Sequence, residues 1–296
     1  MTDDAGPTVG DAGPTVGDAG PTVGDAGPTV GDAGPTVGDA EVPAVGLGTM
    51  GLDTAADARA VTTAVEMGYR HVDTAQIYGN EAVVGDALAA ADVPREDVFL
   101  ATKVWADQLA HDDVISSTRE SMAKLGVDYL DLLYVHRPID AYDPPETLAA
   151  FDRLREEGLI RHVGVSNFEL SDLETARAHL EAPIAAHQTE YHPLFTRPEL
   201  VADAREHGYA PVAYSPLAGG RVADVPEVVA VAEKHDATPH AVSLAWVRAK
   251  GFAVVPKASS EPHLRANLDA ATTLELDASD VARIDAIDRE RELFPE

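Results

Sequence analysis

The amino-acid sequence predicts an α/β protein of the (β/α)8 TIM-barrel class, preceded by a disordered N-terminal repeat tail. Three observations support this prediction. From Glu41 onward, short apolar runs alternate with segments of helical periodicity, and there are eight such runs. The chain has 296 residues, which is enough for a single barrel of about 250 residues. A doubly wound open sheet is the alternative architecture.

The tail consists of five copies of DAGPTVG between residues 4 and 38. Each copy contains two glycines and a proline but only one valine, so the seven-residue period cannot form the seam of a coiled coil. We expect residues 1–40 to be disordered, as linkers of this composition are, and residues 41–296 to form the barrel. An interaction or solubility role for the tail is compatible with this composition.

The eight apolar runs are the expected strands, and we expect a helix between each run and the next. In chain order they are VGLGTM (45–50), YRHVDTA (69–75), VFLATKVW (98–105), YLDLLYVHR (129–137), HVGVSNF (162–168), AAHQTEY (185–191), PVAYSPL (211–217) and FAVVPKA (252–258). Residues 46–51 fit the pattern GxGxxG, which would favour the open sheet. However, no acid closes a second strand at the distance that a dinucleotide fingerprint requires, so this pattern is weak evidence.

Net charge excludes several kinds of partner. The chain contains 51 acidic and 22 basic residues, a formal charge of −29. The first forty residues hold seven acids and no base, so the remainder carries 51 − 7 = 44 acids against 22 bases, or −22. Such a field disfavours nucleic acid and anionic membrane surfaces. Because lysine is scarce as well, the composition is typical of halophilic proteins, and we expect folding to depend on molar salt.

The expected cellular location and the absence of a metal follow from what the sequence does not contain. No run approaches the roughly 20 apolar residues of a membrane helix, and the N-terminus shows no basic region followed by an apolar one. We therefore expect a soluble, cytoplasmic protein, and we expect it to be a monomer. The chain has no cysteine and its histidines show no metal-ligand spacing, so we expect no metal site.

Four residues with complementary chemistry fall near the ends of three consecutive expected strands. Asp73 ends the second strand and Tyr78 follows five residues later, while Lys103 and His136 lie at the ends of the next two. Taken singly, each has an ordinary structural explanation, such as a turn former or a packed ring. Because the carboxyl ends of parallel strands meet at the ligand-binding face of a barrel, we expect all four side chains to share one site.

With these residues in place, the chain resembles the aldo-keto reductases from Glu41 to Glu296. Residues 68–85, GYRHVDTAQIYGNEAVVG, and residues 161–168, RHVGVSNF, match the two signatures of that family. The resemblance implies a barrel that binds NADP(H) in extended form and reduces aldehydes and ketones. It also implies that Asp73, Tyr78, Lys103 and His136 are its catalytic residues.

The chemistry of these side chains agrees with that implication. Reduction of a carbonyl by hydride leaves negative charge on oxygen, which must be protonated as it develops. Tyr78 would donate the proton, and a nearby Lys103 ammonium would lower the tyrosine pKa. Asp73 would keep Lys103 charged and oriented, and His136 would hydrogen-bond the carbonyl oxygen.

The resemblance also implies a set of cofactor-binding residues. Ser166, Asn167 and Gln188 would bind the nicotinamide carboxamide, Tyr214 would stack on the ring, and Ser215 and Leu217 would meet the pyrophosphate. Lys257, His263 and Asn267 would lie at the adenosine end.

One departure from the family bears on the choice of cofactor. His263 stands where relatives commonly have arginine, which grips a phosphate in a way that histidine reproduces only in part. We therefore expect NADP(H), with weakened discrimination against NAD(H) as the alternative cofactor. Arg265 is an alternative partner for the phosphate, although a solvated helix position explains it more simply.

The expected substrate pocket combines apolar walls with one cation. Met50 and Trp105 match pocket-lining positions, whereas Arg137 stands where many relatives have tryptophan. An inward-facing Arg137 would favour anionic or polyhydroxy carbonyl substrates, and the alternative is an arginine turned to the rim. The chain ends soon after its last helical segment, which predicts an open pocket. A sensor or regulatory barrel with little turnover is the alternative to an enzyme.

Overall fold

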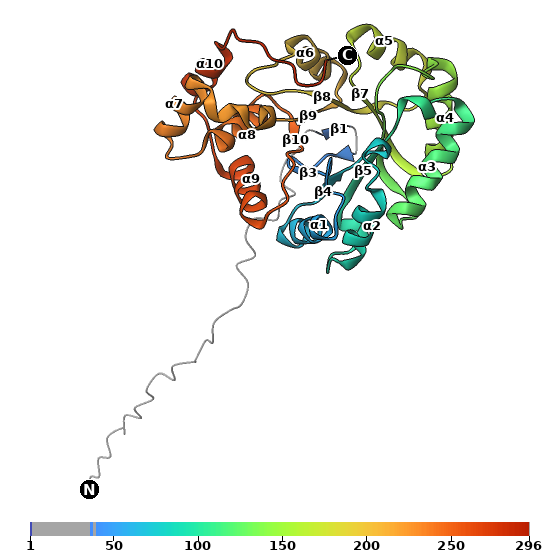
Figure 1. Ribbon diagram of the computed structural model, residues 1–296, viewed down its shortest axis with the longest axis horizontal. Coiled ribbons are helices and arrows are strands. Elements are labelled where there is room, and N and C mark those ends of the chain that lie inside the picture. Colours follow the sequence, from blue (N-terminus) through green and yellow to red (C-terminus); the bar gives the residue numbers. More distant parts are fainter. Residues whose placement is uncertain (2–35, 38–39, 296) are drawn as a thin grey trace.

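A computed structural model describes residues 1, 36–37 and 40–295 of the chain. Eight parallel strands form a central barrel and helices surround it (Figure 1). The prediction of disorder covers residues 1–40, of which residues 2–35 and 38–39 lie outside the described residues. Among the described residues, no helix is both long and apolar enough to cross a bilayer.

Each of the eight expected runs overlaps one strand of the barrel, although β7, β8 and β9 begin one or two residues before their runs, and neighbours in sequence are neighbours in the sheet. The ring is closed by a parallel bridge between Val45 and Val254 and by a hydrogen bond from Val254 N to Ala44 O of 3.0 Å. The prediction of a (β/α)8 barrel is therefore confirmed. The strands are β3 (Gly46–Gly48), β4 (His71–Asp73), β5 (Phe99–Val104), β6 (Leu130–Val135), β7 (Ile160–Ser166), β8 (Ile184–Glu190), β9 (Ala210–Tyr214) and β10 (Ala253–Val254).

Helices follow the strands and begin at residues that suit helix N-termini. Thr54 and Asp277 each form a capping box at the start of a helix, and prolines occupy the first turn of several others, where a missing N–H costs nothing. The α-helices are α1 (Ala55–Met67), α2 (Glu81–Ala90), α3 (His111–Leu125), α4 (Pro144–Glu156), α5 (Leu170–His179), α6 (Pro198–His207), α7 (Pro226–Lys234), α8 (Pro239–Ala249), α9 (Glu261–Thr273) and α10 (Ala278–Asp285).

Four short 3-10 helices, η1 (Gln76–Tyr78), η2 (Arg95–Asp97), η3 (Ala106–Gln108) and η4 (Ala218–Asp224), lie in the connections. Of these, η1 matters most for the site because it carries Tyr78. It follows β4 directly and precedes α2, so it lies at the carboxyl end of a barrel strand, where ligands bind in this architecture.

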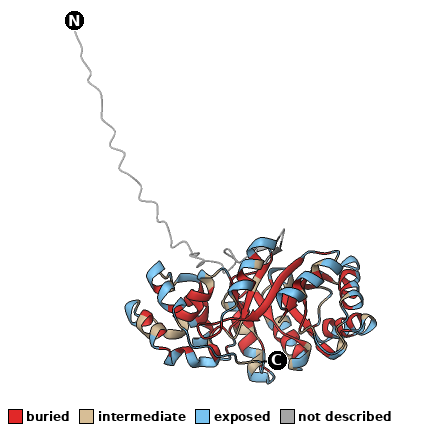
Figure 2. Cartoon of the chain, turned by 90° about the horizontal axis from the view of Figure 1, so that it is seen from above, coloured by how far each residue is buried: buried red, intermediate tan, exposed pale blue. Residues whose placement is uncertain are grey.

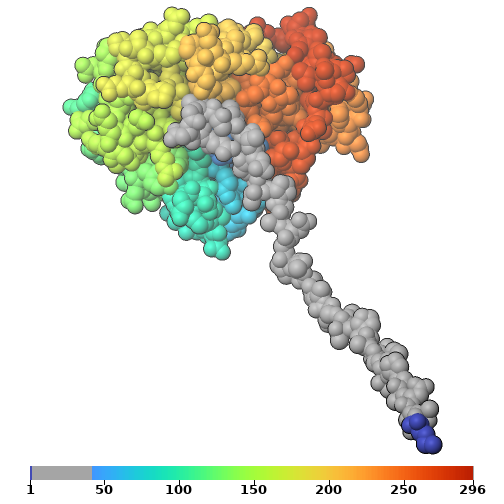
Figure 3. Space-filling model, turned by 180° about the vertical axis from the view of Figure 1, so that it is seen from behind, coloured from blue at the N-terminus to red at the C-terminus, as the bar shows by residue number. Residues whose placement is uncertain are grey.

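Apolar side chains fill the space between the strands and the inner faces of the helices. Figure 2 shows that the strands are buried almost throughout, whereas the helices carry exposed residues on their outer faces. Seen from behind, the barrel units follow one another round the body in sequence order, so the last units lie beside the first (Figure 3). The carboxyl ends of all eight strands therefore converge on one face.

A separate antiparallel pair joins β1 (Thr36–Val37) to β2 (Ala40–Glu41). Thr36–Val37 belongs to the last copy of the repeat, so the pairing begins inside the segment expected to be a disordered tail. The sequence TV offers two β-branched residues, which favour strands. The described pairing therefore begins at a strand-prone dipeptide.

Candidate active site

A cavity of about 270 Å³ opens at the carboxyl ends of the barrel strands. Most of the residues expected in the site line it. They are Met50, Asp73, Tyr78, Trp105, His136, Arg137, Ser166, Asn167, Gln188, Tyr214, Ser215 and Lys257.

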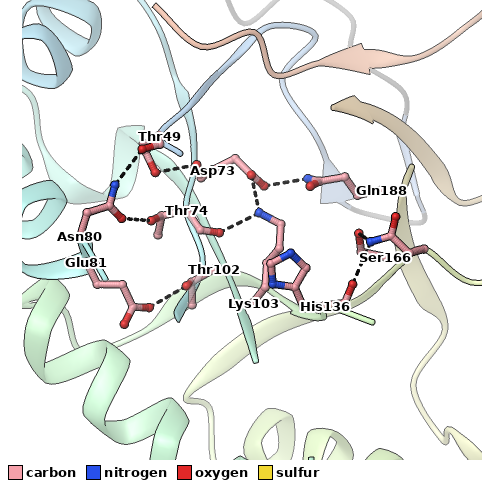
Figure 4. Close-up of polar contacts among 11 residues, drawn as sticks. Thr49, Asp73, Thr74, Asn80, Glu81, Thr102, Lys103, His136, Ser166 and Gln188 are labelled. Atoms are coloured by element: carbon pink, nitrogen blue, oxygen red, sulfur yellow. Dashed lines mark hydrogen bonds and ion pairs between the residues drawn. The ribbon is translucent and has the colours of Figure 1, made fainter. Parts of the chain in front are cut away.

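Lys103 and Asp73 form a buried ion pair at the site (Figure 4). Lys103 Nζ donates to Asp73 Oδ1 at 2.5 Å and to Thr74 O at 2.8 Å. The other carboxylate oxygen of Asp73 accepts from Gln188 Nε2 at 2.8 Å. An ion pair this deeply buried is costly unless its hydrogen bonds are satisfied, and here both charged groups have at least two partners.

Lys103 is charged in this environment and acts on Tyr78. Burial works to lower the pKa of Lys103, but Asp73 and Tyr78 outweigh it and raise the pKa above the ordinary lysine value. Lys103 Nζ lies 5.3 Å from the centre of the Tyr78 ring. A lysine ammonium has three N–H donors, and the two spent on Asp73 and Thr74 leave one for the phenol oxygen.

The pKa of Tyr78 is raised above its ordinary value, mainly by burial. Lys103 lowers this pKa, as expected, but does not overcome the cost of placing a phenolate in a dry site. The expected effect of Lys103 is therefore present, but the larger effect of burial leaves the pKa above its ordinary value. Tyr78 is a neutral phenol that carries its proton, which is the form a proton donor requires.

His136 is uncharged. Burial lowers the pKa of its imidazole to about 2, with further lowering by Lys103 and Arg137. Its ring packs edge-on against Trp105, with the ring centres 5.0 Å apart, and against Tyr78 at 6.0 Å. A neutral imidazole keeps one N–H, so His136 can donate a hydrogen bond to an oxygen in the cavity without adding charge.

The turn that carries Tyr78 is fixed from both sides. The Asn80 side chain accepts from Thr74 Oγ1 at 3.1 Å and donates to Thr49 O at 2.7 Å and to Leu52 O at 3.0 Å. Gln76 Oε1 accepts from the backbone N–H of Trp105 at 2.9 Å. These bonds tie η1 to β3 and β5, so the position of the phenol is set by three strands rather than by a free loop.

The ends of β7 and β9 supply polar groups and an aromatic ring on another wall of the cavity. Asn167 Nδ2 donates to His136 O at 3.0 Å, and Asn167 Oδ1 accepts from Tyr214 OH at 2.9 Å. Asn167 and Ser215 both have left-handed backbone conformations, with φ of 59° and 50°. Non-glycine residues held this way cost about 1–3 kcal/mol each and concentrate at functional sites.

Four of the predicted site residues do not line the cavity. Lys103 lies behind Asp73 and Tyr78 rather than on the cavity surface. Leu217, His263 and Asn267 are not among the residues that line the cavity. Leu217 precedes η4, and His263 is exposed in the first turn of α9, where Asn267 is buried one turn later.

The sequence analysis missed Phe294, which lines the cavity. Its ring meets Tyr214 with centres 5.8 Å apart and an interplanar angle of 75°. The C-terminal segment therefore forms part of the cavity wall, a contact that the expectation of an open pocket did not include. The only signal in the sequence was an aromatic residue close to the chain end.

A family model described as Aldo/keto reductase family matches residues 44–289. A methylglyoxal reductase DkgB of Escherichia coli O157:H7 is 40% identical over 86% of this chain and 97% of that protein. An aldo-keto reductase of Mycolicibacterium smegmatis is 37% identical over 86% of this chain and 93% of that protein.

Solved structures give the same result. A candidate 2,5-diketo-D-gluconic acid reductase B superposes with a TM-score of 0.83 at 37% identity, covering 86% of this chain and 92% of that one. An aldo-keto reductase of Bombyx mori in complex with NADP superposes with a TM-score of 0.77 at 32% identity, covering 84% of this chain and 90% of that one.

Proposed function

The chain belongs to the aldo/keto reductase family of carbonyl-reducing oxidoreductases, and on this basis we propose that it reduces aldehydes and ketones to alcohols with NADP(H), using Tyr78 as the proton donor. The observation that carries the proposal is the buried Lys103–Asp73 pair directly behind Tyr78 in the cavity wall. A buried cation beside a neutral phenol is an arrangement suited to donating a proton to a developing alkoxide.

The residues along the cavity fit a nicotinamide dinucleotide. Ser166 and Asn167 offer hydroxyl and amide groups for a carboxamide, and the Tyr214 ring offers a flat apolar surface. Lys257 is exposed at the rim and supplies a positive charge for a phosphate. When bound there, the cofactor would supply a hydride to the carbonyl carbon. We propose Gln188, Ser215, Leu217, His263 and Asn267 as further contacts.

Each catalytic side chain then has one task. His136 donates a hydrogen bond to the substrate oxygen and keeps it beside Tyr78. Tyr78 gives its proton to that oxygen as charge builds there, and the remaining phenolate is stabilised by the Lys103 ammonium. Asp73 holds Lys103 charged and in place. In an interior of low effective dielectric, this fixed cation has a stronger effect than it would have in water.

For the substrate, we propose a small polar aldehyde or ketone. Relatives at 40% and 37% identity carry the names methylglyoxal reductase and 2,5-diketo-D-gluconic acid reductase B, which supports small compounds with more than one oxygen. Met50 and Trp105 would form the apolar walls, and Arg137 lines the cavity and would attract anionic or hydroxyl-rich substrates. We expect the protein to act as a cytoplasmic monomer.

The alternative function, a barrel that senses nicotinamide cofactor with little turnover, is separated from the proposal by one assay. Purified full-length protein in high salt is mixed with NADPH and methylglyoxal, and the absorbance of the reduced cofactor is followed. We expect steady loss of absorbance over many turnovers. Binding of NADPH without loss of absorbance, with methylglyoxal and with a panel of reactive aldehydes, would favour the sensor.

A further inference from the structure

The C-terminal segment 291–295 crosses from α10 toward α6 and reaches the active-site cavity (Figure 1). Arg291 N donates to Leu194 O at 2.7 Å. Three residues later, Phe294 supplies part of the cavity wall. The segment therefore needs an anchor if the position of Phe294 is to be fixed.

Glu190, the last residue of β8, is that anchor. Its carboxylate is buried, with 2% of the residue exposed. Glu190 Oε1 accepts from Leu293 N at 2.7 Å, and Oε2 accepts from Phe294 N at 3.1 Å. Two consecutive backbone N–H groups thus converge on one carboxylate, an arrangement that binds a chain segment strongly because the acceptor is charged.

A third donor completes the arrangement. His192 Nε2 lies 2.9 Å from Glu190 Oε1, while His192 Nδ1 accepts from Leu194 N at 3.2 Å. Since Nδ1 is an acceptor, the proton of the neutral ring is on Nε2, which donates to Glu190. The end of β8 and the residues just after it therefore supply both the carboxylate that holds the segment and the imidazole that holds the carboxylate.

Phe294 stands between two chambers. The active-site cavity of about 270 Å³ and a neighbouring cavity of about 260 Å³ have four residues in common. The second chamber is more polar and also contains Glu190 and Arg197. The shared residues are Arg137, Asn167, Tyr214 and Phe294.

We propose that Glu190 is a positioning residue that sets the length of the substrate: it latches segment 291–295 so that Phe294 divides one long channel into two chambers. With the latch closed, the site takes short carbonyl compounds. A longer hydroxyl-bearing chain reaches the second chamber only when Phe294 moves. This inference rests on the proposed carbonyl reduction, but the latch itself has a readout that needs no activity.

Amide hydrogen exchange of residues 293 and 294 tests the latch. Glu190→Gln removes the charge and turns a donor toward the backbone N–H groups, so we expect exchange at both amides to become at least about tenfold faster, given the loss of charge-assisted bonds. Glu292→Gln is the matched control, because it removes an exposed carboxylate from the same segment and should leave exchange unchanged. Unchanged exchange in Glu190→Gln would overturn the latch.

Kinetics with 3-hydroxypropanal and 8-hydroxyoctanal test the effect on substrate length. In Glu190→Gln, the kcat/KM ratio of the long to the short aldehyde should rise at least tenfold, mainly through a lower KM for the long one. In a Phe294→Ala background, the same Glu190 change should alter the ratio no further, because the latch acts through this ring. Independent, additive effects would contradict the proposal.

A chain ending at residue 290 keeps the test decisive if Glu190→Gln does not fold. It removes the segment without touching the buried carboxylate, and the long-to-short ratio should rise to a similar extent. An unchanged ratio would overturn the length-setting role. If the unaltered protein reduces neither aldehyde, the proposed function fails, and the exchange experiment still decides whether Glu190 holds the segment.

Discussion

At the scale of single residues, the protonation of Tyr78 is decided by two opposing effects. Burial raises its pKa and Lys103 lowers it, and burial is the larger in the cavity as it stands. The residue type and spacing of Tyr78 and Lys103 identify the pair in the sequence. They do not give the balance, because the extent of burial depends on side chains from several strands.

His263 is the residue on which cofactor choice is predicted to depend. Replacing it by arginine should raise the kcat/KM ratio of NADPH over NADH about tenfold, since a bidentate guanidinium–phosphate contact is worth about 1.5–3 kcal/mol. Steady-state rates with both cofactors at one salt concentration measure this ratio. Arg265→Ala is the control and should leave the ratio unchanged. A collapse of NADPH preference in Arg265→Ala would show that Arg265 holds the phosphate instead.

At the scale of secondary-structure elements, the close packing of α2 against the end of α3 depends on Gly85. A Cβ at this position would lie 2.6 Å from the backbone oxygen of Leu125. Backbone cannot move aside as a flexible side chain can, so the contact admits only glycine without a shift of one helix. This approach helps hold α2, which follows the turn that carries Tyr78.

Gly85→Ala is therefore predicted to destabilise the fold. Helix propensity alone would favour alanine by about 1 kcal/mol, whereas overpacking typically costs about 1–3 kcal/mol. We expect the cost of overpacking to exceed the gain in helix propensity, so the free energy of unfolding in urea should fall. Ala89→Gly, at an exposed position of the same helix, calibrates the propensity effect. A more stable Gly85→Ala variant would mean that α2 is free to move.

The elements also show how much of the fold can be predicted from the sequence. Each expected run overlaps its strand because buried parallel strands are continuous apolar runs, yet β10 is only the two residues Ala253–Val254 of a seven-residue run. The ends of such runs turn toward the cavity and leave the ladder. Phe294 could not be predicted, because its place depends on Glu190, 104 positions away in the chain.

At the scale of the whole molecule, three buried histidines couple stability to pH. Burial lowers the pKa of His71 to about 4, of His136 to about 2 and of His187 to about 3. In the unfolded chain each has a pKa near 6.5, so below that pH the unfolded state binds more protons. Stability contributed by these groups is present above pH 6.5 and is lost as the pH falls.

We therefore predict that the free energy of unfolding decreases between pH 7 and pH 5. The slope is at most about 1.4 kcal/mol per pH unit for each histidine. Urea denaturation at several pH values in one salt measures it. His71→Leu removes one of these three titrating groups, so it should make the pH profile flatter. The position suits the test because the two ring nitrogens of His71 have no hydrogen-bond partner in the described structure. Rising stability toward pH 5 would contradict this account.

The charge of −29 gives a second prediction at this scale. Salt shortens the Debye length from about 10 Å at 0.1 M to about 3 Å at 1 M, which weakens repulsion among the surface carboxylates. The melting temperature should therefore rise from dilute buffer to molar KCl. Calorimetry at matched pH measures it, and a melting temperature that stays level or falls would argue against salt dependence.

The central claim is that the Tyr78 hydroxyl protonates the substrate, and Tyr78→Phe tests it most directly. This variant keeps the ring and removes only the donor, so kcat with NADPH and methylglyoxal should fall by about 10²–10⁴, the usual contribution of a general acid. The Kd for NADPH, measured by fluorescence titration, should stay within about threefold, because Tyr78 is not among the residues proposed to bind the cofactor. Turnover close to that of the unaltered protein, with cofactor bound, would contradict the account.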